Sequence, residues 1–143
     1  MKLERPAPEL SLTSAQRAIL RALPTAELIE RAAQMVNVES DQAGEILARA
    51  CGLAWMNSES MPLLAFDTAL VDVAIARSRQ CLVAKAGNPR LGLLVDPFDQ
   101  ATRVFLESVT FPLPITLALT STVEFEKALQ RIETTHSFLT SPE

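Results

Sequence analysis

The side chains that come closest to a catalytic pair in this sequence are Asp96 and Asp99, two carboxylates three positions apart. Carboxylates this close could divide the roles of general acid and general base. However, an apolar run ends just before Asp96, and an amphipathic segment follows Pro97. There Asp96 would cap a helix, Pro97 would occupy its first turn, and Asp99 would lie near the positive end of the helix dipole. We therefore interpret Asp96, Pro97 and Asp99 as the start of a helix, and a paired-acid site remains the alternative.

Other catalytic or cofactor-binding motifs are absent from the sequence. It has no G-x-x-x-x-G-K-[ST] or G-x-G-x-x-G loop for phosphates, and no G-x-S-x-G nucleophile elbow. Cys51 and Cys81 belong to no C-x-x-C pair, and His136 is the only histidine, so a zinc site cannot be completed. The sequence therefore predicts no catalytic, cofactor-binding or metal-binding residue, and we expect that this chain is not an enzyme.

Basic side chains are densest around Arg77, Arg79, Lys85 and Arg90. Arg77, Arg79 and Arg90 could form a patch that contacts a protein partner. The alternative is a solvated edge, in which Arg77 and Arg79 favour the C-terminus of a helix. The net charge of the whole chain is −4, whereas nucleic-acid binding usually requires a basic excess. We therefore expect no nucleic-acid partner.

The composition indicates a globular protein, with 48% hydrophobic and 21% charged residues. No apolar run approaches the roughly 18 residues that a membrane-spanning helix needs. No N-terminal segment has the pattern of a signal peptide. These features predict a cytoplasmic protein without direct membrane insertion.

The first half of the chain has the periodicity of helices. Residues 1–9 contain two prolines and no periodic pattern, and we expect a flexible arm there. Residues 10–57 are predicted to form a helical subdomain. Its first helix starts at a capping box from Thr13 to Gln16, its second ends near Asn37, and its third is capped by Ser40 or Asp41 and ends before Gly52. A short extended segment at residues 53–56 follows.

The second half mixes helices with strands and is predicted to form an α/β subdomain over residues 58–134. It is expected to begin with a helix at 66–78, capped by Asp67 or Thr68. A hairpin follows, with strands 81–86 and 91–95 and a turn at 87–90. The last elements are a helix from Asp96 to Val109, a strand at 115–119, and a final helix that begins at a capping box at Ser121. Residues 135–143 would be a tail or the start of a linker. The predicted fold class is α+β: one compact domain, with the helical half packed on a mixed sheet of about three strands that form a hairpin and then a βαβ crossover.

A longer pattern runs from residue 90 to residue 101, Arg-Leu-Gly-Leu-Leu-Val-Asp-Pro-Phe-Asp-Gln-Ala. It resembles the junction of strand and Asp-Pro-x-Asp in the N-terminal domain of type II secretion and type IV pilus assembly ATPases, the N-terminal domain family of general secretory pathway protein E. The following strand 115–119 and helix 121–132 match the same layout, and residues 46–55 resemble its helix end. The resemblance covers residues 25–133.

This resemblance implies a non-catalytic role in bacterial protein transport. It implies a docking or regulatory domain that binds the cytoplasmic part of an inner-membrane platform protein, at the inner face of the inner membrane. The ATPase itself would lie beyond residue 143.

One branch of the resembled family binds cyclic di-GMP through helical motifs that begin with Arg-Leu-Gly. This sequence departs from that pattern, because its only such triplet, Arg90-Leu91-Gly92, lies in the predicted hairpin. We assign no ligand residues and expect no bound cofactor. The alternative function is a regulatory domain that senses cyclic di-GMP, as in similar domains attached to glycosyltransferases.

Overall fold

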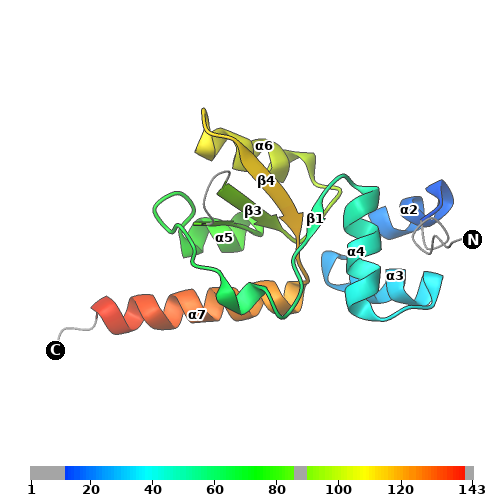
Figure 1. Cartoon of the computed structure of the whole chain (residues 1–143), viewed down its shortest axis with the longest axis horizontal. Coiled ribbons are helices and arrows are strands. Elements are labelled where there is room, and N and C mark those ends of the chain that lie inside the picture. The colour runs from blue at the N-terminus through cyan, green and yellow to red at the C-terminus, as the bar shows by residue number, and fades with distance from the viewer. Residues whose placement is uncertain (1–11, 86–89, 141–143) are drawn as a thin grey trace, which may run out of the picture.

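The computed structural model of the protein describes residues 12–85 and 90–140, with side chains as far as residue 134. The arm predicted for residues 1–9 and residues 87–89 of the predicted hairpin turn lie outside the described residues. The fold is α+β, as the sequence predicts: the helical N-terminal half packs beside a small mixed sheet that is covered by further helices (Figure 1).

The described part of the N-terminal half, from residue 12 onward, contains the α-helices α2 (Ser14–Arg21), α3 (Leu28–Val36) and α4 (Ser40–Ala50) and the 3-10 turn η1 (Thr25–Glu27). The predicted capping box at the start of α2 is confirmed. The backbone N–H of Gln16 donates to Thr13 Oγ1 at 3.1 Å, and the N–H of Thr13 donates to Gln16 Oε1 at 2.9 Å. The predicted end of α3 is also confirmed, because Asn37 adopts the left-handed conformation with φ of 58°.

The sequence predicts the C-terminal end of α4 correctly but not its N-cap. Its N-cap residue is Glu39, whose side chain makes no capping hydrogen bond. The predicted cap by Ser40 or Asp41 is therefore wrong, since the extended backbone at Glu39 already places Ser40 inside the helix. The predicted end is confirmed: Gly52 has φ of +73°, and the N–H of Leu53 reaches back to the Ala48 carbonyl at 2.8 Å.

The sheet contains four strands in the order β1-β4-β3-β2. They are β1 (Ala54–Trp55), β2 (Cys81–Ala84), β3 (Arg90–Leu94) and β4 (Ile115–Leu119). Strands β2 and β3 are antiparallel and β3 and β4 are parallel, so the predicted hairpin and crossover are confirmed. The fourth strand is β1, which pairs in parallel with β4. The sequence predicts only an extended segment there, because two residues are too few for a strand pattern.

The remaining helices are α5 (Val73–Arg79), α6 (Gln100–Thr110) and α7 (Thr122–Thr140), with a 3-10 turn η2 (Met61–Leu63). The helix predicted for residues 66–78 starts later than expected. Phe66 forms a β-bridge with Ala84, and the N–H of Asp67 donates to the Val83 carbonyl. The backbone of these two residues therefore pairs with strand β2 and cannot be part of a helix. The N-cap of α5 is Asp72, which accepts from the N–H of Ile75 at 2.9 Å, and the predicted caps Asp67 and Thr68 are wrong.

The last helix begins where the sequence predicts. Ser121 Oγ accepts a hydrogen bond from the N–H of Glu124 at 3.1 Å. The helix continues to Thr140, so the tail or linker predicted to start at residue 135 is helical as far as residue 140. Figure 1 shows α6 and α7 on opposite sides of the sheet, with α7 extending beyond it.

One hydrophobic core joins the two halves of the chain. Its fully buried side chains come from both the helical half and the sheet half, and include Leu20, Leu28, Leu47, Leu82, Leu94, Phe125 and Leu129. All four residues of β2 are buried, as expected for a strand covered on both faces. The shared core fixes the position of α2 and α4 relative to the turn that leads from β3 into α6.

Candidate functional site

The two conspicuous acids, Asp96 and Asp99, both bind backbone amides, but not in the predicted arrangement. Asp96 Oδ1 accepts from the N–H of Phe98 at 3.0 Å and so closes a turn. Asp99 is the N-cap of α6: its Oδ1 accepts from the N–H of Thr102 at 3.2 Å, and its Oδ2 accepts from the Thr102 hydroxyl at 2.8 Å. The predicted cap by Asp96 is therefore wrong, because the Asp96 turn holds Pro97 and Phe98 outside the helix.

Replacing Asp99 by alanine is expected to lower the free energy of unfolding by about 1 kcal/mol, since α6 loses its N-cap. Asp99→Asn keeps the acceptor oxygen and is expected to lie near the wild type. Asp96→Ala removes one bond outside the helix and is expected to cost less than Asp99→Ala. Urea unfolding followed by circular dichroism measures all three. If Asp96→Ala costs more than Asp99→Ala, our assignment of the cap is wrong.

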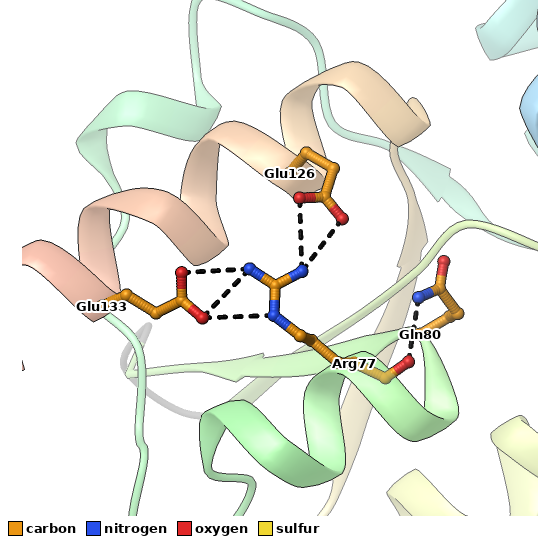
Figure 2. A network of polar contacts seen from close by, with 4 residues as sticks. All are labelled: Arg77, Gln80, Glu126 and Glu133. Atoms are coloured by element: carbon orange, nitrogen blue, oxygen red, sulfur yellow. Dashed lines mark hydrogen bonds and ion pairs between the residues drawn. The ribbon is translucent and has the colours of Figure 1, made fainter.

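The predicted contact residue Arg77 is held by two carboxylates of α7 (Figure 2). Its Nε and Nη2 donate to Glu133 at 3.0–3.1 Å, and its Nη1 donates to Glu126 at 3.4 Å. The hydrogen bond and charge of Glu133 raise the pKa of Arg77. The three side chains are almost half exposed, so the network lies on the surface and links α5 to α7.

Arg79 and Arg90 lie in separate places and also have partners within the chain. The Arg79 guanidinium lies over the ring of Phe105, 4.4 Å from its centroid. Arg90 Nη1 donates to Asp67 Oδ2 at 2.7 Å. Arg79 precedes β2 at the end of the hairpin where Cys81 pairs with Leu94, whereas Arg90 starts β3 at the opposite end. The structure therefore does not bring the three arginines together, and their role in partner contact stays a prediction.

The turn between α6 and β4 exposes large apolar side chains. Phe111 is 80% exposed and Leu113 is 56% exposed, and the prolines between and after them are exposed as well. We call residues 111–114 the apolar turn. Figure 1 shows that this turn projects beyond the sheet. Exposed apolar groups of this size, clustered in one turn, are typical of contact sites for other macromolecules.

A second feature that no sequence motif predicts is a pocket of about 510 Å³ lined by three arginines. Arg17 and Arg21 reach it from α2, and Arg103 reaches it from α6. The spacing of Arg17 and Arg21 places them on one face of a helix and is the only sequence signal for this site. We call it the arginine pocket, and its lining residues are Arg17, Arg21, Ala50, Cys51, Pro97, Phe98, Gln100 and Arg103.

A larger pocket, of about 670 Å³, has the opposite charge. It lies between α3, α4 and the ends of β1 and β4, and its acidic lining residues are Glu30, Glu39, Asp41 and Glu124. Open α/β sheets often bind ligands at the carboxyl ends of their strands. Within the described residues, however, no group of three or more His, Cys, Asp or Glu side chains is placed to hold a metal ion.

The two cysteines are free thiols. Cys81 is buried, and burial raises its pKa to about 11, so the thiol is protonated at neutral pH. Cys51 is partly buried beside the arginine pocket, and burial raises its pKa as well. Neither cysteine has the lowered pKa of a catalytic thiol.

The chain matches no protein-family model, and comparisons with curated proteins and with solved structures also found no match. Across residues 12–85 and 90–140, every helix is too short or too polar to cross a membrane.

Proposed function

We propose that this chain is a non-catalytic docking domain of a bacterial type II secretion or type IV pilus ATPase. In this proposal it binds the cytoplasmic part of an inner-membrane platform protein, which holds it at the inner face of the inner membrane. The observation that carries the proposal is the order of elements from residue 90 onward. Strand β3, the Asp96-Pro97 turn, α6, the parallel strand β4 and the Ser-capped α7 follow one another as the resemblance implies.

We assign the partner contact to the apolar turn. Phe111 and Leu113 expose most of their apolar surface, and burying a side chain of this size against a partner contributes about 1.5–3 kcal/mol. The predicted patch of Arg77, Arg79 and Arg90 is a weaker candidate for the main contact. Arg77 and Arg90 would have to exchange existing ion pairs for new ones, and such an exchange gains little net free energy.

Replacing Phe111 and Leu113 together by serine is expected to weaken binding to the platform domain roughly tenfold or more, as for the loss of a central apolar contact. Both side chains are exposed, so the fold should be unaffected. Calorimetry or a pull-down with the purified cytoplasmic domain measures the effect. Leu63→Ser is the matched control, because Leu63 is 83% exposed but lies on η2.

Two outcomes would count against the proposal. If the wild-type chain and the folded platform domain do not associate, the docking function is wrong. If they associate but the double serine variant binds as tightly as Leu63→Ser, the contact lies elsewhere on the surface and the Arg77, Arg79 and Arg90 patch becomes the next surface to test.

A domain that senses cyclic di-GMP, as those attached to glycosyltransferases do, is the second candidate function. Arg90, Leu91 and Gly92 lie in strand β3, so this triplet does not open a helix. The arginine pocket is the observation that favours anion sensing, through residues outside that motif. A flat calorimetric titration with cyclic di-GMP at high micromolar concentration would remove this candidate.

A further inference from the structure

We propose that the arginine pocket binds the phosphate group of a small phosphorylated molecule. Arg17 and Arg21 from α2 and Arg103 from α6 line the same pocket, whose volume of about 510 Å³ lies in the range of small-molecule sites. Pro97 and Phe98 add an apolar wall for the remainder of the ligand. The site does not depend on the docking proposal, and its test needs no partner protein.

Charge is the first argument for a phosphate. Within residues 12–85 and 90–134, no carboxylate forms an ion pair with Arg17, Arg21 or Arg103, whereas Arg49 and Arg90 each have one and Arg77 has two. All three pocket arginines act electrostatically on the Cys51 thiol, and Asp96 is the single described carboxylate that opposes them. The pocket therefore has an excess of positive charge, which favours a multiply charged anion.

The position of Arg103 is the second argument. Its Nη2 donates to the carbonyl oxygens of Cys51, at 2.7 Å, and of Pro97, at 3.0 Å. These bonds hold the guanidinium between the end of α4 and the start of α6. The Nε of Arg103 is buried and has no hydrogen-bond partner among the described residues. That nitrogen is enclosed by the protein and is out of reach of a ligand, but Nη1 makes no hydrogen bond to a described residue. A guanidinium that is already held in place is suited to a phosphate oxygen, because it does not have to be ordered on binding.

The two arginines of α2 are available to the same ligand. The Arg21 guanidinium lies over the ring of Phe98, 4.9 Å from its centroid. Its N–H groups donate to no described residue, and stacking leaves them in the plane where they can bind a ligand. Among the described residues, Arg17 makes only long bonds, to the Leu12 carbonyl at 3.3 Å and to Ser14 Oγ at 3.4 Å. Exchange of these bonds for charge-assisted bonds to phosphate is favourable.

Cys51 lines the pocket and reports on its occupancy. Burial raises the pKa of this thiol, and the charges of Arg103, Arg17 and Arg21 partly offset that effect. A bound anion would counter the arginines and shield the sulfur, so alkylation of Cys51 should slow. Cys81 is buried, so the alkylation signal comes from Cys51.

The test uses inorganic pyrophosphate and a nucleoside diphosphate as probes, at low ionic strength. We expect both to bind in calorimetry and to slow the reaction of Cys51 with iodoacetamide. The variant with Arg17→Gln and Arg21→Gln should bind at least about tenfold more weakly, because it loses charge-assisted hydrogen bonds. Each variant is compared with and without the probe, since removing arginines also changes the intrinsic rate of Cys51.

Arg31→Gln is the matched control, because Arg31 is an exposed arginine of α3 that does not line the pocket. It should bind pyrophosphate as the wild type does. Absence of pyrophosphate binding at millimolar concentration overturns the proposal, and so does equal binding by the double variant and Arg31→Gln. Tighter binding of the nucleoside diphosphate than of pyrophosphate supports the proposal, and it indicates that Pro97 and Phe98 contact the nucleoside part of the ligand. Equal binding of the two supports it with the phosphate group alone as the determinant.

Discussion

Replacement of Phe125 by alanine is expected to lower the free energy of unfolding by about 3–5 kcal/mol, the largest effect that we predict. Phe125 lies at the end of the first turn of α7, is 1% exposed, and is the largest of the fully buried side chains among the described residues. Ala128 and Leu129 are buried on the same helix, so the deleted ring would leave a cavity in a close-packed core. The loss combines the transfer free energy of the ring with the cost of that cavity.

Urea unfolding monitored by circular dichroism and by the fluorescence of Trp55, the only tryptophan, measures this effect. Val123→Ala is the matched control, since Val123 lies on the same helix but is 61% exposed. Its effect should stay within about 0.5 kcal/mol. If Phe125→Ala costs no more than Val123→Ala, then α7 does not pack on the sheet as described.

The second large effect is expected at Gly44, inside α4. A Cβ atom at this position would overlap Cη2 and Cζ2 of Trp55, whose indole lies against the helix backbone. Gly44→Ala should therefore lower the free energy of unfolding by about 1–3 kcal/mol through overpacking. Helix propensity alone predicts the opposite sign, because alanine is about 1 kcal/mol more favourable than glycine in an open helix.

A double-mutant cycle separates the two contributions. In a Trp55→Leu background the overlap is removed, and Gly44→Ala should then be neutral or stabilising. Circular dichroism replaces tryptophan fluorescence as the probe there. If Gly44→Ala stabilises the wild-type protein, the contact between α4 and β1 is not as close as the structure has it.

Elements that depend on local signals are the ones that the sequence predicts best. The capping box at Thr13, the left-handed stop at Asn37 and the glycine end at Gly52 each depend on hydrogen bonds within a few residues, and all three are confirmed. The hairpin and crossover also followed from sequence, because apolar runs separated by turn residues can pair in few ways.

The errors occur where a distant partner decides the local structure. Residues 66–67 have a helical pattern, but the edge of β2 offers their backbone hydrogen bonds that a helix would exclude. The predicted N-cap of the helix after β3 is Asp96, but the observed N-cap is Asp99, because the Asp96 carboxylate closes a turn instead. Strand β1 exists only because β4 lies beside it.

The same distinction applies to the candidate sites. The sequence alone determined that a helix starts close to Asp99, that catalytic motifs are absent, and that the fold is α+β, because these depend on residue types and short spacings. Only the tertiary structure decided that Arg77 meets Glu126 and Glu133, and that Arg17, Arg21 and Arg103 line one pocket. Long side chains find their partners through the packing of whole helices, and that packing depends on the shared core rather than on any local pattern.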